Sequence, residues 1–116
     1  MMISCLSMAQ AGGEILIQAN RATLERDYTK ALDLYSQYIA VNPDDFRGYF
    51  NRGTTEYNAG KFDDAIADFT KTLHLNRRYN EAYYYRGQCY VAMNNYISAV
   101  EDYTFVLTTQ PKSVPF

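Results

Sequence analysis

The sequence has few of the residues that mark an enzyme centre, a metal site or a secreted domain. Its 116 residues include one histidine, two cysteines and no tryptophan. The cysteines, Cys5 and Cys89, are too few and too far apart for a disulfide framework or for structural zinc, which takes four closely grouped ligands. We therefore expect no metal, no cofactor and a reducing, cytoplasmic compartment.

The sequence also lacks an excess of charge and a long apolar run. Against 13 Asp and Glu, 11 Lys and Arg give a net charge of -2, so the positive field that binds phosphate backbones is missing and nucleic acid is not an expected partner. No segment approaches the ~18 apolar residues of a membrane span, and Met1–Ala11 lacks the basic start of a secretory signal. A hydrophobic content of 47% predicts a folded chain, and the length fits one domain.

Internal repetition is the strongest pattern in the sequence. The tract Tyr49–Leu73 aligns without a gap with Tyr83–Leu107, 34 positions later. A further shift of 34 toward the N-terminus aligns a degenerate first copy between Ile15 and Ile39. A period of this length is typical of a stacked repeat array, in which no unit can bury its apolar face alone.

Each copy is predicted to form a helix, a tight turn and a second helix. Apolar residues three and four positions apart give both halves one apolar face. Asn58–Gly60 and Asn94–Asn95 mark the turns, because Gly and Asn tolerate the left-handed backbone that ends a helix. Asn42–Pro43 and Gln110–Pro111 follow second helices, which Pro cannot continue.

These residues resemble the tetratricopeptide repeats, whose unit has 34 residues and small side chains where its helices cross. The matching residues are Gly53 and Gly87 in first helices, Ala31, Ala65 and Ala99 in second helices, and Pro43 and Pro111 at the ends. The resemblance implies an all-α fold, a right-handed superhelical solenoid of three antiparallel helix-turn-helix repeats. Its expected parts are an N-terminal segment 1–11, a degenerate repeat 12–45, two repeats 46–79 and 80–113, and a tail 114–116.

Three departures from the family pattern carry expectations of their own. Ala19 stands where the family prefers Gly, and Glu56 where it prefers a packing Tyr, so looser packing is expected at both crossings. Arg77 stands in place of a Pro, so the second helix of the middle repeat is expected to run on into Arg78.

Two arginine and aspartate pairs recur at the same spacing. Arg52 precedes Asp68 by 16 positions and Arg86 precedes Asp102 by 16, whereas the first copy has Gln and Leu at these places. Charges that occur together and are lost together predict structural ion pairs between the two helices of one repeat. The alternative is that these arginines bind a carboxylate or phosphate of a ligand.

The resemblance also implies a concave groove on the first helices. We call its implied binding residues the groove residues: Asn20, Phe50, Asn51, Tyr57, Tyr84, Tyr85 and Gln88. Amides can hydrogen-bond the backbone of an extended peptide, and rings supply rigid contact area. We therefore expect a protein or peptide partner that is neutral or mildly apolar. The alternative is that this face is solvated or covered by the ends of the chain.

One subclass of the family binds the acidic C-terminal tails of chaperones with a basic clamp of Lys, Asn, Asn, Lys and Arg. This sequence has Leu16, Asn20, Asn51, Glu81 and Tyr85 at the matching places. Both Asn are kept, but all three positive charges are missing and one is reversed. Because carboxylates would lose their charge-assisted hydrogen bonds, a chaperone-tail binder is not expected.

No catalytic pattern is present. His74 fits a surface position near a helix end, and no phosphate loop, serine elbow or metal motif occurs. The expected function is a non-enzymatic interaction module or scaffold. Because Pro111–Phe116 is too short and too rich in Pro to form another helix, the last repeat is expected to be uncapped. Two alternatives therefore stay open: a structural protein that self-assembles head to tail into homo-oligomers, and a fragment of a longer array.

Overall fold

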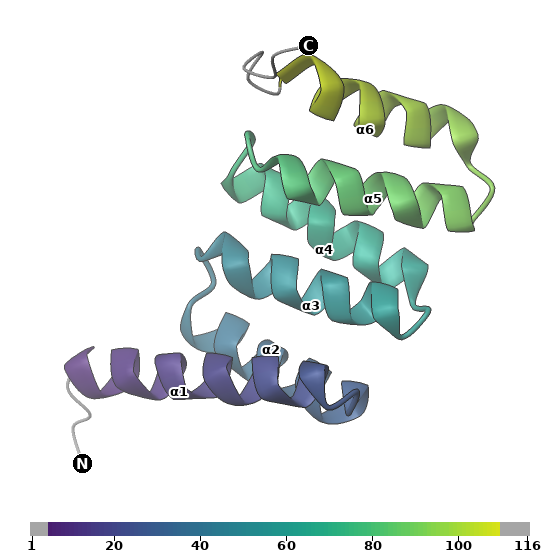
Figure 1. The fold of residues 1–116 in the computed structure, drawn as a ribbon. Helices are drawn as coiled ribbons and strands as arrows, with labels where there is room; N and C mark the ends of the chain where they lie inside the picture. Colours follow the sequence, from purple (N-terminus) through teal and green to yellow (C-terminus); the bar gives the residue numbers. More distant parts are fainter. Residues whose placement is uncertain (1–4, 110–116) are drawn as a thin grey trace, which may run out of the picture.

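The computed structural model describes residues 5–109, with side chains from Ala11 onward, and this part of the chain consists of helices joined by short turns (Figure 1). The helices are α1 (Cys5–Leu24), α2 (Tyr28–Val41), α3 (Phe46–Asn58), α4 (Phe62–Leu75), α5 (Asn80–Ala92) and α6 (Tyr96–Thr109). No strand occurs within these residues, so the predicted all-α class is confirmed. The predicted stop at Gln110–Pro111 and the tail 114–116 lie outside the described residues.

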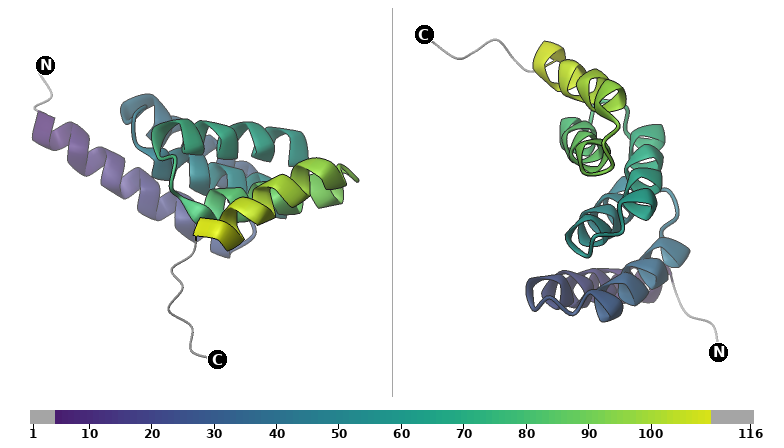
Figure 2. Two further views of the ribbon diagram at one scale, coloured as in Figure 1. Left: turned by 90° about the horizontal axis from the view of Figure 1, so that it is seen from above. Right: turned by 90° about the vertical axis from the view of Figure 1, so that its right-hand side faces the viewer.

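Consecutive helices form three hairpins, α1–α2, α3–α4 and α5–α6, stacked along one axis (Figures 1 and 2). Each second helix packs on the next first helix, and α3 contacts both α1 and α5, so the first helices follow one side of the stack. The radius of gyration of 15.9 Å exceeds the roughly 13 Å of a compact domain of this length. This elongated stack is the predicted solenoid of three repeats.

The turn inside each hairpin places one residue in the left-handed region at the same point of the repeat. Arg26 has a φ of 61°, Gly60 of 79° and Asn94 of 63°. The Gly and the Asn adopt this backbone readily, so the sequence predicts their turns. The arginine carries no such signal.

A small residue is needed where the helices of each hairpin cross. A Cβ added at Gly53 would lie 2.8 Å from Cε1 of Phe69, and one at Gly87 would lie 2.8 Å from Cε1 of Tyr103. Either contact is too close for a carbon atom, so the glycines allow the rings to reach the helix backbone. Ala19 stands at this place in the first hairpin and is fully buried.

The apolar core is divided along the stack. One cluster joins α4 to α5 and consists of Ala65, Phe69, Leu73, Ala82 and Cys89. The other lies in the first hairpin and consists of Ala19, Ala22, Ala31 and Tyr35. Burial raises the pKa of the Cys89 thiol to about 12, so this cysteine packs as a small apolar residue, as the sequence predicts.

Two helix ends differ from the expectations. The expected extension of α4 to Arg78 is wrong, because α4 ends at Leu75 and the side chain of Asn76 accepts a hydrogen bond from the Arg78 N–H at 3.3 Å. This bond turns the chain out of the helix. At the other end, α1 begins at Cys5, so part of the expected segment 1–11 belongs to the first helix.

Candidate functional site

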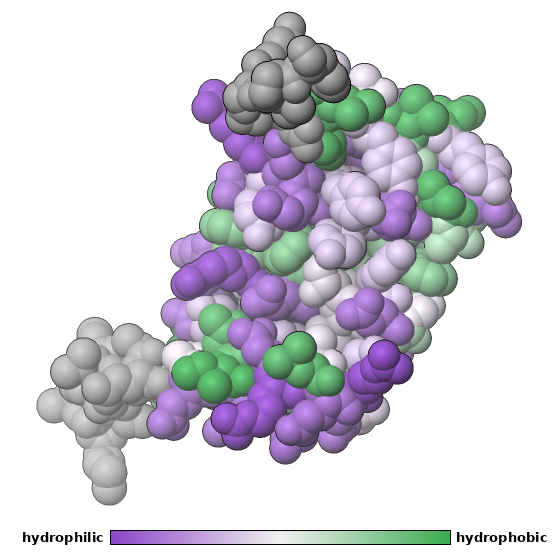
Figure 3. Space-filling view, viewed as in Figure 1, coloured by the Kyte–Doolittle hydropathy of each residue, from purple (hydrophilic) through white to green (hydrophobic). Residues whose placement is uncertain are grey.

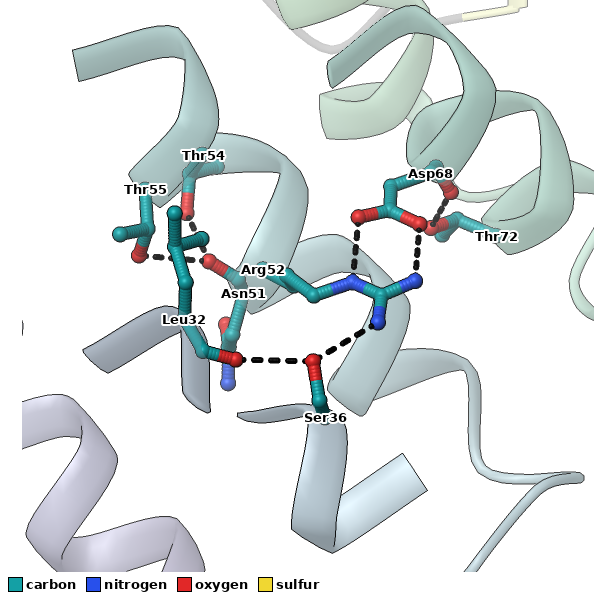
Figure 4. Close-up of polar contacts among 8 residues, drawn as sticks. All are labelled: Leu32, Ser36, Asn51, Arg52, Thr54, Thr55, Asp68 and Thr72. Carbon is teal, nitrogen blue, oxygen red and sulfur yellow. Dashed lines mark hydrogen bonds and ion pairs between the residues drawn. The ribbon is translucent and has the colours of Figure 1, made fainter. Parts of the chain in front are cut away.

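Both arginines of the predicted ion pairs bind their aspartate with two hydrogen bonds. Arg52 on α3 donates from Nε and Nη2 to the Asp68 carboxylate on α4, at 2.7 and 2.8 Å (Figure 4). Arg86 on α5 donates in the same way to Asp102 on α6, at 2.9 and 2.8 Å. The aspartate side chains are only 8% and 7% exposed. Because the carboxylates occupy Nε and Nη2, the guanidinium groups are engaged inside the hairpins.

Each arginine also reaches the preceding hairpin, a contact that the sequence analysis missed. Nη1 of Arg52 donates to Oγ of Ser36 on α2 at 3.2 Å (Figure 4). Nη1 of Arg86 donates to Oγ1 of Thr70 on α4, also at 3.2 Å. Ser36 and Thr70 are 34 positions apart and hold the same place in the repeat. A single Ser or Thr does not indicate a contact with an arginine, so only the spacing of 34 positions could have predicted these hydrogen bonds. The arginines thus join successive hairpins.

Glu56 is buried beside the first of these pairs. It is 8% exposed, and its Oε1 has no hydrogen-bond partner among the described residues. Burial and then the nearby Asp68 carboxylate raise the pKa of Glu56 to about 9, against a smaller lowering by Arg52. Its carboxyl group is therefore protonated at neutral pH.

The aromatic groove residues form one connected cluster. The ring of Tyr85 is central, with centroid distances of 5.9 Å to Phe50, 6.0 Å to Tyr57 and 5.4 Å to Tyr84. Phe50, Tyr57 and Tyr85 are half-buried against the core, whereas Tyr84 is 45% exposed. Three of the four rings therefore hold the middle and last hairpins together, and Tyr84 offers the most accessible surface.

Two amide groove residues are held by tyrosine hydroxyls. The Tyr35 hydroxyl on α2 donates to Oδ1 of Asn20 on α1, at 2.5 Å. The Tyr103 hydroxyl on α6 donates to Oε1 of Gln88 on α5. This link was not predicted from the sequence, although both pairs share a spacing of 15 positions that could have shown it.

Asn51 lies half-buried on α3, the helix between α1 and α5. Its backbone carbonyl accepts hydrogen bonds from the hydroxyls of Thr54 and Thr55, each at 2.9 Å (Figure 4). The Thr55 hydroxyl also lies 3.1 Å from the hydroxyl of Thr23 on α1. A polar contact therefore links the first helices of the first two hairpins beside the predicted groove.

The places of the basic clamp carry no positive charge. Leu16 packs against the core of the first hairpin, Glu81 is exposed, and Tyr85 is the centre of the ring cluster. A cavity of about 300 Å³ opens beside the start of α5, and it is lined by Asn80, Glu81, Tyr84, Tyr85 and Val106. The charged side chain in this lining is an acid, which suits a ligand without carboxylates.

One face of α6 is apolar and exposed, and we call it the terminal face: Tyr96, Ile97, Val100 and Leu107. Figure 3 shows hydrophobic side chains gathered over this helix. Leu107 is 75% exposed, whereas Leu73, one repeat earlier, is 6% exposed because it packs with residues of α5. Within residues 5–109 no helix covers the terminal face.

His74 is exposed in the last turn of α4, as the sequence predicts. The side chains that the structure describes, from Ala11 to Thr109, include no group of three suited to hold a metal ion. None of the helices within residues 5–109 is long and apolar enough to cross a bilayer.

The comparison with protein families agrees with the 34-residue register and the stack of hairpins. The tetratricopeptide repeat profile matches residues 50–112, which is more than half of the chain. The chain therefore belongs to the tetratricopeptide repeat family.

Its relatives include longer proteins. DnaJ homolog subfamily C member 7 from Homo sapiens is 37% identical over 95 residues, which are 78% of this chain and 19% of that protein. Serine/threonine-protein phosphatase 5 from Homo sapiens is 31% identical over 98 residues, which are 84% of this chain and 20% of that protein. The chain thus spans about a fifth of the length of these curated relatives.

Among solved structures, the first TPR of Spaghetti (RPAP3) bound to the HSP90 peptide SRMEEVD is similar, with a TM-score of 0.84 and 27% identity. The match covers 90% of this chain and 82% of that one. A domain of the same fold and nearly the same extent therefore holds a peptide.

Proposed function

We propose that the chain is a non-enzymatic interaction module or scaffold that binds a peptide segment along α1, α3 and α5. The observation that carries the proposal is the pair of amide groups held by tyrosine hydroxyls on the same helices as the accessible ring of Tyr84. Held amides and exposed rings suit the backbone and side chains of an extended peptide. The peptide bound to the similar RPAP3 domain supports this class of ligand. A buried free thiol at Cys89 suits a cytoplasmic location.

We also propose that the ligand is neutral or mildly apolar rather than an acidic chaperone tail. The groove has no Lys or Arg at the clamp positions, and the exposed Glu81 carboxylate repels acidic side chains. An uncharged segment avoids that repulsion and still finds amide donors and rings.

The test compares two peptides that differ only in charge. Acetyl-SQMEEVD, which is the peptide SRMEEVD with a blocked N-terminus and Gln in place of its Arg, is titrated beside acetyl-SQMQQVN-amide, which carries no charge. We expect the neutral peptide to bind at least about threefold more tightly. Glu81→Lys/Tyr85→Arg rebuilds part of the clamp and should reverse the preference. Glu101→Lys, an exposed charge reversal on α6, is the matched control and should not. Tighter binding of the acidic peptide by the unmodified chain would contradict the proposed selectivity.

The contact assignment has its own test. Tyr84→Ala should weaken binding of the neutral peptide by about 1 to 3 kcal/mol, because it removes the most accessible ring of the groove. Unchanged affinity in this variant would remove Tyr84 from the site. If neither acetyl-SQMQQVN-amide nor any peptide of a random neutral heptapeptide library binds, the proposed function fails.

Head-to-tail self-assembly is the second candidate, and the exposed terminal face of α6 favours it. The repeat register argues against it. Glu14 on α1 is exposed and holds the place of Gly48 and Ala82, which are buried where a first helix packs on the hairpin before it. A second copy that docked through α1 would bury the Glu14 carboxylate. We expect sedimentation to show a monomer at every concentration, and growth of the particle with concentration would favour assembly.

A further inference from the structure

We infer that Tyr35 and Tyr103 are positioning residues of the groove, which turn the amide NH₂ groups of Asn20 and Gln88 toward carbonyl oxygens of a bound peptide. The inference rests on the proposed function and adds to it the chemistry that the groove selects. It assigns a binding role to two tyrosines that otherwise count only as packing residues.

The geometry of a primary amide determines where its NH₂ group points when its oxygen is bound. The oxygen and nitrogen of a primary amide lie on opposite sides of one carbon, so an oxygen bound to a tyrosine hydroxyl directs the nitrogen away from it. Tyr35 binds the oxygen of Asn20, and Tyr103 binds the oxygen of Gln88. Neither amide nitrogen has a hydrogen-bond partner among the residues whose side chains the structure describes, Ala11 to Thr109. Each therefore has two free N–H donors.

The amide and the tyrosine occupy the same positions of the repeat in the first and last hairpins. Asn20 and Gln88 are 68 positions apart, which is two repeats, and so are Tyr35 and Tyr103. In the middle repeat the amide and the hydroxyl are both missing, because Thr54 and Phe69 stand there. The Thr54 hydroxyl donates instead to its own helix, at the Asn51 carbonyl.

In each pair the tyrosine hydroxyl is the donor of the hydrogen bond and the amide oxygen is the acceptor. Burial raises the pKa of Tyr35 and of Tyr103, so both hydroxyls keep their proton across the physiological range. A hydroxyl that keeps its proton can serve as the donor and leaves the amide oxygen as the acceptor. The groove then presents donors to its ligand at both ends.

The distance between the NH₂ groups of Asn20 and Gln88 sets the length of peptide that could contact both. The first helices α1, α3 and α5 contact one another in turn, and packed helices lie about 8 to 10 Å apart. The two amides are therefore separated by roughly 20 Å, which an extended chain rising about 3.3 Å per residue spans in about six residues. Carbonyl oxygens near both ends of such a segment match the donors.

The experiment uses NMR signals of the side-chain NH₂ groups in the full chain, with the blocked neutral hexapeptide acetyl-ASASAS-amide as the probe. We expect the peptide to shift the NH₂ signals of Asn20 and Gln88. Gln88→Glu keeps an oxygen for Tyr103 but has no donor, so binding should weaken by about fivefold. Tyr103→Phe should weaken binding to a similar degree, and Phe69 shows that the fold accepts Phe at this place of the repeat.

A double-mutant cycle separates positioning from general packing. If Tyr103 acts through the amide, Tyr103→Phe should cost no further affinity in a Gln88→Ala background. Additive losses, or full affinity in Tyr103→Phe and Gln88→Glu while the signals of Tyr84 and Tyr85 still move, would overturn the inference and leave the proposed function standing. If the peptide moves no groove signal at all, the inference is overturned, and the neutral heptapeptide library decides separately whether the proposed function fails.

Discussion

The first and the middle hairpins fill equivalent positions with different polar contacts. In the middle hairpin Arg52 is paired with Asp68, whereas the first hairpin has Gln18 and Leu34 at these places. The reverse holds two positions later on the first helix and one position later on the second helix. Here the first hairpin has an amide bound to a tyrosine hydroxyl, and the middle hairpin has neither group. The last hairpin contains both contacts.

The comparison teaches that each contact is a unit of two residues, present or absent as a whole. The ion pairs tie a hairpin to the one before it, because Arg52 and Arg86 also bind hydroxyls of the preceding second helix. The tyrosine and amide pairs lie within one hairpin and end at the groove. One repeat can contain an ion pair and a tyrosine–amide pair together. The residues that hold the hairpins together and the residues proposed to bind the peptide therefore occupy separate positions of the repeat.

The largest expected effect comes from breaking one unit in the last hairpin. Asp102→Ala leaves the Arg86 guanidinium, whose side chain is 18% exposed, without its carboxylate. The loss should lower the free energy of unfolding by about 3 kcal/mol. Arg86→Gln/Asp102→Leu copies the first hairpin and should cost less, because no charge is left unpaired. Urea unfolding followed by circular dichroism measures both variants.

The middle hairpin supplies the control for this prediction. Glu56 is close enough to Asp68 and Arg52 to share their electrostatics, whereas the last hairpin has Tyr90 at the place of Glu56. When Asp68 is removed, Glu56 can ionise and partly neutralise Arg52. Asp68→Ala should therefore cost about 1 kcal/mol less than Asp102→Ala. If Arg86→Gln/Asp102→Leu lowered the free energy of unfolding as much as Asp102→Ala, the arginine and the aspartate would not act as a unit.

A smaller effect is expected from Glu56 itself, a buried acid whose place is taken by Ala22 in the first hairpin and by Tyr90 in the last. Its folded-state pKa of about 9 lies above the ordinary 4.5, so the folded chain holds a proton that the unfolded chain releases. Its contribution to stability is complete below pH 4.5 and is lost as the pH rises through about 9. Glu56→Gln removes this dependence and should be about 2 kcal/mol more stable than the unmodified chain at pH 8.

Thermal unfolding between pH 5 and about 9 tests the sign of this effect. The unmodified chain should lose stability steadily across the range, and the Gln variant should not. Glu101→Gln removes an exposed acid of α6 and is the matched control, with no expected change in slope. Parallel curves for the unmodified chain and Glu56→Gln would contradict the burial argument.

Much of the fold could be predicted because its determinants recur at a fixed period. The turn at Gly60, the turn at Asn94 and both ion pairs show themselves by repetition. Two of the missed features depend on single residues without a repeated signal. Arg26 adopts the left-handed backbone of the first turn, and Asn76 ends α4 with its own side chain.

The candidate site was less accessible to sequence reasoning. The family pattern indicates which helix face the groove residues share, but burial depends on how hairpins stack on one another. Phe50, Tyr57 and Tyr85 pack between hairpins and are half-buried, a property that spacing within one repeat does not reveal. The hydrogen bond from Tyr35 to Asn20 joins residues of two helices, so the spacing of 15 positions that it shares with the bond from Tyr103 to Gln88 can be interpreted only when the helix crossing is known.

The smallest expected effect comes from installing the missing contact in the middle hairpin with Thr54→Gln/Phe69→Tyr. The ring of Phe69 lies against Gly53 as the ring of Tyr103 lies against Gly87. A Cβ added at either glycine would be 3.2 Å from Cζ of the ring. A hydroxyl added to Phe69 should therefore point as the Tyr103 hydroxyl does and bind the new amide.

This variant should bind acetyl-ASASAS-amide about threefold more tightly, because a third NH₂ group joins the two at the ends of the groove. Phe69→Tyr alone and Thr54→Gln alone are the controls, since neither forms the contact. Thermal unfolding should show a loss of less than about 1 kcal/mol, because the two outer hairpins already accommodate tyrosine at this place. An equal gain from Thr54→Gln alone would mean that the amide needs no tyrosine to orient it, and the difference between the first and middle hairpins would then have no part in recognition.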